Sequence, residues 1–307
     1  MRQLDDHVPS PVPAAQHRVQ AWITLAALAL VWGSSYILIK KSLVDFSPSQ
    51  IGHFRLAIAG LAFAPIALRR VWGAGAKTWL GLFIVGLCGT GLPSFLFPFA
   101  QTQISSSLAA ALSSLVPLLT LLVGVSMFGT GLRSRQVQGI LIGLVAAVML
   151  VGTRYGWASL SDGGWPLLYI GAAVLATLCY ALSSNYVKAK FPDTDPLYVT
   201  AGAMAPLGVY GAIGVVALGG LPTNFAASDT LLFSYGAVVF LGLIGTALAS
   251  WLFFRLVQLT EPVFASTVSY LVPIVAFMWG VLDGEAITLD TIALLALILF
   301  GVYRARK

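Results

Sequence analysis

The residue of this sequence that is best suited to chemistry is Arg55, a cation inside a long apolar stretch. It lies about a turn and a half from one end of its predicted helix, and no acidic residue lies at a similar depth. A charge in such a place is costly and usually faces a cavity or a partner. A guanidinium group suits a carboxylate or another anion. We therefore interpret Arg55 as a binding residue for an anionic group; the alternative is a structural anchor that bonds helix-end carbonyls.

Two polar and aromatic clusters form the second group of candidate residues. Ser34 and Ser35 recur as Ser183 and Ser184, 149 residues further on, and aromatic side chains surround both pairs. We expect the two clusters to face each other across a central cavity. The alternative is that their small residues only allow helices to approach closely. The predicted lining residues are Trp32, Ser34, Ser35, Tyr36, Tyr180 and Asn185.

Pro117 and Pro273 fall in the middle of two other apolar stretches. A proline inside a helix removes a hydrogen bond and frees a carbonyl, and broken helices often mark the binding site of a transporter. The alternative is an inert kink, satisfied by Ser113 or Ser269 four residues earlier. We predict a kink at each proline, and we add the polar aromatic Tyr270 to the candidate transport path.

Other kinds of chemistry lack their residues. No Asp or Glu lies in the middle of a predicted span, which disfavours coupling through an intramembrane carboxylate. There is no Walker A sequence for ATP binding. The patterns of metal-dependent or aspartyl membrane enzymes are absent, so we predict no catalytic residue, no metal and no cofactor. A membrane-embedded lipid-modifying enzyme stays as an alternative, and its only candidates for a nucleophile and base are Ser34, Ser35 and His53.

The composition predicts that these residues lie in a helical membrane protein. The chain is 58% hydrophobic and only 9% charged, against about 25% charged residues in soluble domains. Apolar runs of about 20 residues, long enough to cross a bilayer, recur along the whole length. The net charge of +6 lies mainly in short loops, as membrane orientation requires. The expected partners are therefore the lipid bilayer and a small-molecule substrate, and not nucleic acid.

Ten transmembrane helices are predicted, with loops too short for a soluble domain. Thirteen Lys and Arg residues fall on the side of the N-terminus, against three on the other side. This bias places both termini in the cytoplasm and makes residues 1–20 a polar cytoplasmic tail. The predicted spans are residues 21–39, 50–68, 78–99, 104–128, 136–153, 165–187, 197–219, 230–254, 262–282 and 288–303.

An internal repeat organises these spans. Residues 86–117 match residues 242–273 at a constant offset of 156, with 13 of 32 positions identical. Five spans precede the midpoint and five follow it. Because five is odd, the second copy must enter the membrane upside down relative to the first. The sequence thus predicts an all-α membrane protein built as a 5+5 inverted-topology repeat, with its substrate bound between the halves.

Several motifs, each weak alone, stand in a specific order along the chain. They are Trp32–Tyr36 with Lys40, Pro48 followed by Arg55–Ala57, Ser113–Pro117, Ser269–Pro273, and Trp279–Gly280 followed by Asp283–Glu285. In this order they resemble the drug/metabolite transporter superfamily, in its ten-helix branch of two EamA-type repeats. One departure is that the fourth span ends without the Gly-Glu pair that the ninth span retains.

The resemblance implies a secondary transporter of small metabolites in the bacterial inner membrane, working by alternating access. We predict the first EamA-type repeat over residues 21–155 and the second over 165–303. An exporter or exchanger of amino acids is the favoured reading, and a multidrug or lipophilic-cation exporter is the alternative. Gly139 and Gly143 form a G-x-x-x-G motif, which favours packing inside the molecule and leaves a homodimer open.

Overall fold

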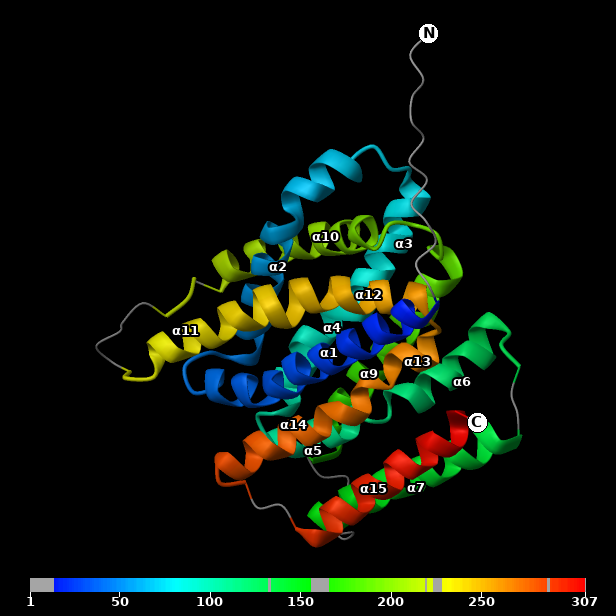
Figure 1. Ribbon diagram of the computed structural model, residues 1–307. Coiled ribbons are helices and arrows are strands. Elements are labelled where there is room, and N and C mark those ends of the chain that lie inside the picture. Colours follow the sequence, from blue (N-terminus) through cyan, green and yellow to red (C-terminus); the bar gives the residue numbers. More distant parts are fainter. Residues whose placement is uncertain are drawn as a thin grey trace.

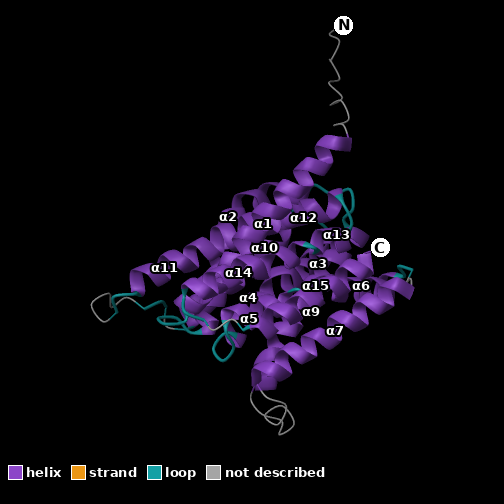
Figure 2. Ribbon diagram, turned by 60° about the horizontal axis from the view of Figure 1, so that its bottom comes forward, coloured by secondary structure: helices purple, strands orange, loops and turns teal. Residues whose placement is uncertain are grey.

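The computed structural model describes residues 14–131, 134–155, 166–218, 220–222, 228–285 and 288–306, and within these ranges it is helical without strands (Figures 1 and 2). Residues 1–13 of the predicted tail and all of the predicted linker between the repeats, residues 156–164, lie outside these ranges. The elements are α1 (Ala14–Ser42), α2 (Pro48–Arg70), α3 (Ala76–Gly86), η1 (Leu87–Gly91), α4 (Leu92–Ala100), α5 (Ser106–Ser113), α6 (Val116–Phe128), α7 (Ser134–Tyr155), α9 (Pro166–Lys190), α10 (Pro196–Ala217), α11 (Leu231–Phe240), η2 (Leu241–Leu248), α12 (Ala249–Leu259), α13 (Pro262–Ser266), α14 (Val268–Leu282) and α15 (Leu289–Arg306).

These elements follow the order of the predicted spans. Eight continuous helical segments of the described chain are long and apolar enough to cross a bilayer. The fifth and tenth predicted spans correspond to α7 and α15, whose apolar stretches are shorter, Val137–Thr153 and Leu289–Gly301. The all-helical membrane fold is thus confirmed, and eight of the ten spans meet the length that a bilayer requires.

The second helix of each half begins with the same local chemistry. Ser47 caps α2 by accepting a hydrogen bond from the backbone of Gln50, and Asp195 caps α10 in the same way from the backbone of Leu197. A proline follows each cap, where its missing N–H costs nothing and its fixed φ suits the first turn. Equivalent residues thus start equivalent helices, at an offset of 148.

Four spans depart from regular α-helix at related places. The third and eighth contain the π-helical segments η1 and η2, and an offset of 156 carries η1 onto residues within η2. The fourth breaks between α5 and α6, with Pro117 in the first turn after the break. The ninth breaks between α13 and α14, ahead of Pro273 inside α14. The fourth span thus breaks beside Pro117, whereas the ninth breaks six residues before Pro273, so the predicted kink at each proline stays a prediction.

The helices pack closely where glycines meet. A Cβ on Gly60 of α2 would lie 2.2 Å from the Cα of Gly208 on α10, its equivalent at the offset of 148. Similarly, a Cβ on Gly301 of α15 would lie 2.6 Å from the backbone nitrogen of Gly143 and 2.7 Å from the carbonyl of Gly139 on α7. The G-x-x-x-G motif therefore contacts a helix of the same chain, and α7 and α15 lie side by side (Figure 1).

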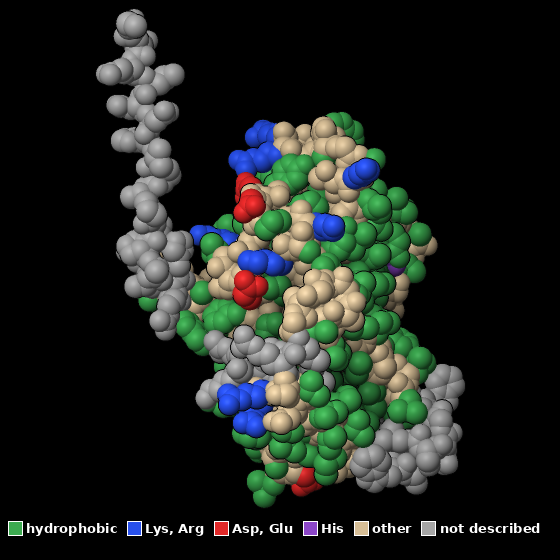
Figure 3. Space-filling model, turned by 90° about the vertical axis from the view of Figure 1, so that its right-hand side faces the viewer, with side chains coloured by type: hydrophobic (Ala, Val, Ile, Leu, Met, Phe, Trp, Pro, Cys, Tyr) green, Lys and Arg blue, Asp and Glu red, His purple; other side chains and the backbone are tan. Residues whose placement is uncertain are grey.

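Basic side chains gather at one end of the molecule. We call the end at which α1 finishes the Lys40 end, and the end at which α9 finishes the Lys188 end. Figure 3 views the molecule from the right-hand side of Figure 1, where α6 and α12 end, and shows Lys and Arg side chains gathered there among hydrophobic ones. The exposed large hydrophobic side chains elsewhere suit a surface that contacts lipid acyl chains.

Candidate functional site

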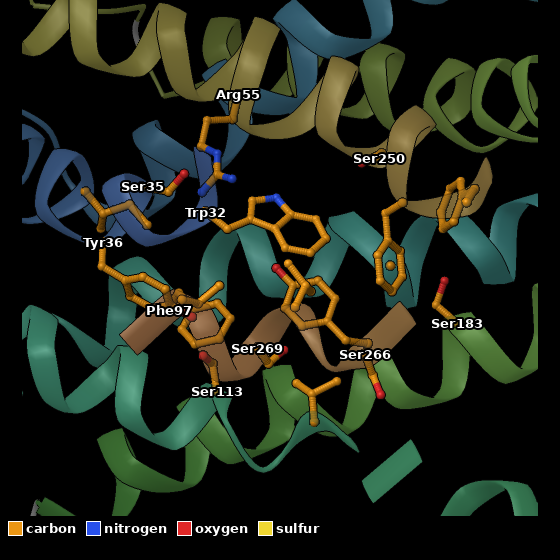
Figure 4. A pocket seen from close by; sticks show the side chains of 18 residues that line it. Trp32, Ser35, Tyr36, Arg55, Phe97, Ser113, Ser183, Ser250, Ser266 and Ser269 are labelled. Carbon is orange, nitrogen blue, oxygen red and sulfur yellow. The ribbon is translucent and has the colours of Figure 1, made fainter. Parts of the chain in front are cut away.

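A cavity of about 70 Å³ lies in the interior, where the two halves of the chain meet (Figure 4). Six serines, six aromatic side chains and one arginine account for most of its wall. The serines are Ser35, Ser113, Ser183, Ser250, Ser266 and Ser269, and the aromatic residues are Trp32, Tyr36, Phe97, Tyr180, Phe253 and Phe254. This mixture of hydroxyls, rings and one cation resembles a binding site more than a packed core.

The wall of the cavity is largely symmetric. At the offset of 148, Trp32 is equivalent to Tyr180 and Ser35 to Ser183, and all four line the cavity. At the offset of 156, three further equivalent pairs line it, namely Phe97 and Phe253, Ser113 and Ser269, and Val116 and Val272. The cavity therefore lies where equivalent surfaces of the two copies face each other.

The same pairing corrects the alignment of the first helices. The predicted offset of 149 aligned Ser34 with Ser183 and Ser35 with Ser184. The offset of 148 instead matches Ser35 with Ser183, and it also carries the N-cap Ser47 onto the N-cap Asp195. We adopt 148 for the helices before residue 70 and their equivalents.

Arg55 is the charged residue in this wall. It comes from α2, its exposed fraction is 8%, and its Nε and Nη2 atoms lie 3.3 and 3.1 Å from Oγ1 of Thr246. The Thr246 hydroxyl in turn donates to the Leu241 carbonyl at 2.7 Å, within the π-helical segment η2. None of the ion pairs among the described residues includes Arg55. Its charge is thus held in position by a hydroxyl but not neutralised.

Aromatic rings surround the space next to Arg55. Trp32 stacks on its repeat equivalent Tyr180, with ring centroids 6.3 Å apart and planes at 18°. Phe97 stacks on Tyr180 and meets the edge of Tyr36, at 6.1 and 5.4 Å. The indole N–H of Trp32 donates to the carbonyl of Gly245, 3.1 Å away, which fixes the ring. These rings give the cavity an apolar wall of defined shape opposite the guanidinium (Figure 4).

Five of the eight residues predicted to form the substrate path line this cavity, and three do not. Ser34 points away, towards the outside of α1, where it accepts a hydrogen bond from the Trp279 indole. Asn185 donates to the carbonyls of Thr120 and Ala181 and lines a separate cleft near the Lys188 end. Tyr270 packs against the core outside the cavity wall. The rotation of α1 turns Ser35 and Tyr36 towards the cavity and Ser34 towards Trp279.

Thr246, Phe97 and Phe253 complete the site and are not among the predicted residues. Thr246, which holds Arg55, belongs to the Gly-Thr pair that is identical in the two copies of the repeat. Phe97 and Phe253 are another identical pair. Identical residues in the two copies therefore indicated members of the site, because residues that line a shared interface have the same neighbours in both copies.

The residues of the enzyme alternative do not come together. Nδ1 of His53 lies 2.8 Å from the carbonyl of Ser49 and 3.2 Å from its hydroxyl, so its hydrogen-bonding partner is on the same helix. The rings of Phe95 and Tyr210 pack on His53. Among the residues that the structure describes, no group of three His, Cys, Asp or Glu side chains is close enough to hold a metal ion.

A network of charges closes the Lys40 end. The Glu285 carboxylate accepts hydrogen bonds from Nζ of Lys40 at 2.8 Å and from the N–H groups and hydroxyls of Ser106 and Ser107, at 2.5–3.2 Å, where α5 begins. Burial raises the pKa of Glu285, but the hydrogen bonds from Lys40 and the two serines outweigh it and lower the pKa to about 2. Lys40 also pairs with Asp283 at 2.7 Å. The first half and the end of the ninth span are thereby joined.

Comparisons with known proteins agree with this architecture. The model of the EamA-like transporter family matches twice, over residues 20–152 and 167–305. A protein of Archaeoglobus fulgidus named as an uncharacterized transporter is 26% identical over 93% of this chain and 98% of its own length. The uncharacterized inner membrane transporter YedA of Escherichia coli K12 is 28% identical over 91% of this chain and 88% of its own. A crystal structure with 21% identity superposes with a TM-score of 0.65 over 94% of this chain and 96% of that one, a likeness of fold.

Proposed function

The chain belongs to the EamA-like transporter family, and from this premise we propose that it is a secondary carrier of a small metabolite with a carboxylate or another anionic group, such as an amino acid. It works by alternating access, as an exporter or exchanger in the inner membrane with both termini in the cytoplasm. The observation that carries the proposal is Arg55, a buried cation in the wall of the central cavity that has no acidic partner among the described residues.

The state of Arg55 favours an anionic ligand. A charge inside a membrane protein is costly and is kept where it pairs or serves a pathway. Thr246 uses two of the guanidinium nitrogens, and Nη1 donates no hydrogen bond among the described residues. A bound carboxylate would supply both the missing charge and the missing acceptor. The two members of a charge-assisted pair would then stabilise each other where water is scarce.

The size of the cavity points to a closed state. A water needs about 10–15 Å³ of such space, so 70 Å³ holds about five waters. A larger solute requires the walls to move apart. Equivalent surfaces of the two halves form those walls, so tilting one half against the other can open the site first towards one end and then towards the other.

The crossing of α2 and α10 suits such a movement. The two helices meet at the equivalent glycines Gly60 and Gly208, which is where a two-fold axis relating the halves would pass. Contacts at an axis change least when the halves tilt about it. We infer that this crossing acts as the fulcrum and that the helices further from it move more.

A transport assay tests the proposal. The purified protein in liposomes should move at least one solute of a panel of amino acids, small carboxylates, nucleosides and amphiphilic cations, without ATP. Arg55→Ala should abolish transport of a carboxylate solute and leave folding nearly intact, because Thr246 keeps its bond to the Leu241 carbonyl. Arg255→Ala, which removes an exposed arginine, is the matched control. If no solute moves, the carrier is refuted, and if Arg55→Ala transports normally, its binding role is refuted.

The aromatic wall supports the second candidate, an exporter of lipophilic cations. The faces of Trp32, Tyr180 and Phe253 can attract a cation, but Arg55 repels one in the same cavity. The two candidates predict opposite results for Arg55→Ala. Export of an amphiphilic cation would be unchanged or faster, whereas transport of a carboxylate would be lost.

A further inference from the structure

We propose that Gln101 forms a second binding point for the transported solute, between the central cavity and the Lys40 end, and that this solute carries both an ammonium and a carboxylate, as a free amino acid does. The inference rests on the proposed carrier function and narrows its substrate class. Its central observation is a buried side-chain amide whose donor and acceptor are both unused.

Gln101 directly follows α4, and 7% of its surface is exposed. Its Oε1 and Nε2 atoms are both buried, and neither has a hydrogen-bond partner among the described residues. Leaving a buried polar group unpaired costs about 1–3 kcal/mol, and such groups are rare in folded proteins unless a ligand or water meets them. The amide is therefore a group that a passing solute can satisfy.

Gln101 lies between the central cavity and a cleft at the Lys40 end. Four residues earlier on α4, Phe97 lines the central cavity, and four residues are about 6 Å along a helix. Gln101 itself lines a cleft of about 520 Å³ at the Lys40 end, together with Lys40 and Asp45. On α1 the same step separates Tyr36 in the cavity from Lys40 in the cleft. Gln101 thus lies on the direct route from the cavity to this end of the molecule.

The charged groups of this cleft, Lys40 and Asp45, are already paired. Lys40 pairs with Asp283 and Glu285. The Asp45 carboxylate accepts hydrogen bonds from the hydroxyls of Ser228 and Ser234 at 2.5 Å and of Thr230 at 2.8 Å. The amide of Gln101 differs from them because, among the described residues, neither its donor nor its acceptor is used.

The chemistry of an amide selects the solute. Nε2 donates to a carboxylate oxygen, and Oε1 accepts from an ammonium group. An amino acid presents both groups on one carbon and can use both atoms of the amide, whereas a simple carboxylate uses only Nε2. Gln101 therefore recognises the amino group beside the carboxylate, which Arg55 does not recognise.

The other copy of the repeat shows that the fold does not need an amide here. The residue equivalent to Gln101 is Val257, which is fully buried in the apolar core. A valine fills this position in the second copy at no hydrogen-bonding cost. The amide in the first copy is hence a departure from the shared scaffold, as Arg55 is against Ala203.

Gln101→Leu tests the inference in proteoliposomes, with Gln103→Leu as the matched control because Gln103 is exposed two residues away. The probes are the amino acids that the wild type moves and the same compounds without the amino group. Loss of about 1 kcal/mol of hydrogen bonding should slow amino-acid transport about fivefold in Gln101→Leu. Transport of the desamino compounds and of all probes by Gln103→Leu should change less than twofold.

Thermal unfolding of the same variants separates binding from a structural role. Leucine removes an unpaired buried amide, so Gln101→Leu should melt about 2 °C higher than the wild type. Normal amino-acid transport, or a lower melting temperature, would overturn the role of Gln101 while leaving the carrier in place. A wild-type protein that moves no solute would instead refute the carrier, and this inference with it.

Discussion

Lys40 and Lys188 are equivalent at the offset of 148, yet their surroundings differ. Lys40 joins a buried carboxylate, Glu285, which is also bonded to the start of α5. Lys188 donates to the carbonyl of Thr260 at 2.8 Å and lies 3.8 Å from the carboxylate of Glu261, which is 74% exposed. One end of the molecule is therefore held by a buried charge network, and the other by contacts that water can replace.

The two copies also differ in the side chains beside the cavity. Thr90 and Thr246 are equivalent, buried, and part of the π-helical segments η1 and η2. Thr246 holds Arg55, whereas the equivalent of Arg55 is Ala203, whose methyl group forms no hydrogen bond. Thr90 lies 3.3 Å from the hydroxyl of Ser250 instead. The two copies thus share their π-helical segments and differ in side chains that could act on a solute.

The largest effect is expected where the copies are alike. Gly60→Ala puts a methyl group into the backbone of Gly208, 2.2 Å from its Cα, and Gly208→Ala does the same in reverse. Backbone does not give way as a side-chain end does, so each change should cost about 3 kcal/mol or more. Both variants should lose most of their folded yield, measured by fluorescence-detected size-exclusion chromatography.

Gly171→Ala is the control for this pair, because a Cβ there meets nothing within 4 Å. If Gly60→Ala and Gly208→Ala differed widely in yield, the crossing would not be a symmetric contact. The two copies would then not be equivalent at the closest contact between them.

Much of this arrangement follows from the sequence, and the parts that do not have physical reasons. Apolar runs of bilayer length predict the order of the helices, and the intramembrane charge predicts that Arg55 faces a cavity. The direction of a side chain needs the rotation of its helix, which short polar clusters do not determine. Ser34 and Asn185 therefore lie outside the cavity although both belong to the predicted clusters.

The π-helical segments could not be predicted either. Their sequences, from Leu87 and from Leu241, are rich in glycine and apolar residues and read as ordinary helix. Only the packing of neighbouring helices decides where an extra residue is inserted into a turn. The hydroxyl of Thr246 reaches Arg55 from such a segment, so this contact was hidden in the sequence even though the threonine is identical in both copies.

Glu285→Gln tests whether the two ends of the molecule are held with different strength. The amide keeps the shape but removes the charge that Lys40 and the start of α5 bind, so we expect a loss of about 2 kcal/mol of folding free energy. Glu261→Gln at the opposite end should change nothing measurable, because that carboxylate is exposed and its pair is long. Urea or thermal unfolding in detergent compares the two variants. Equal losses would mean that the two ends are held equally firmly.

Thr246→Val tests the comparison beside the cavity. Valine keeps the volume but gives up the bond that positions the Arg55 guanidinium, so transport of a carboxylate solute should fall about tenfold, which corresponds to about 1.4 kcal/mol. Thr90→Val removes the equivalent hydroxyl, which contacts Ser250 and not Arg55, and transport should stay within about twofold. Uptake rates at several solute concentrations measure both. Equal slowing by the two variants would show that the threonines support the backbone and not the guanidinium.

The smallest expected effect is the loss of stability between pH 6 and pH 4 that comes from the Lys40 end. The pKa of Glu285 is lowered from its ordinary value of 4.5 to about 2 in the folded protein. A group whose pKa is lowered by folding contributes stability above its unfolded value and loses it as pH falls towards its folded value. The melting temperature should therefore begin to fall as the pH drops below about 5.5 and continue to fall towards pH 2, with about 0.8 kcal/mol lost between pH 6 and pH 4. Glu285→Gln should weaken this dependence, and Glu261→Gln should retain it, because the carboxylate that titrates in this window would still be present. An unchanged pH profile in Glu285→Gln would show that other acids cause it, and that the Lys40 end owes less to this carboxylate than its five hydrogen bonds indicate.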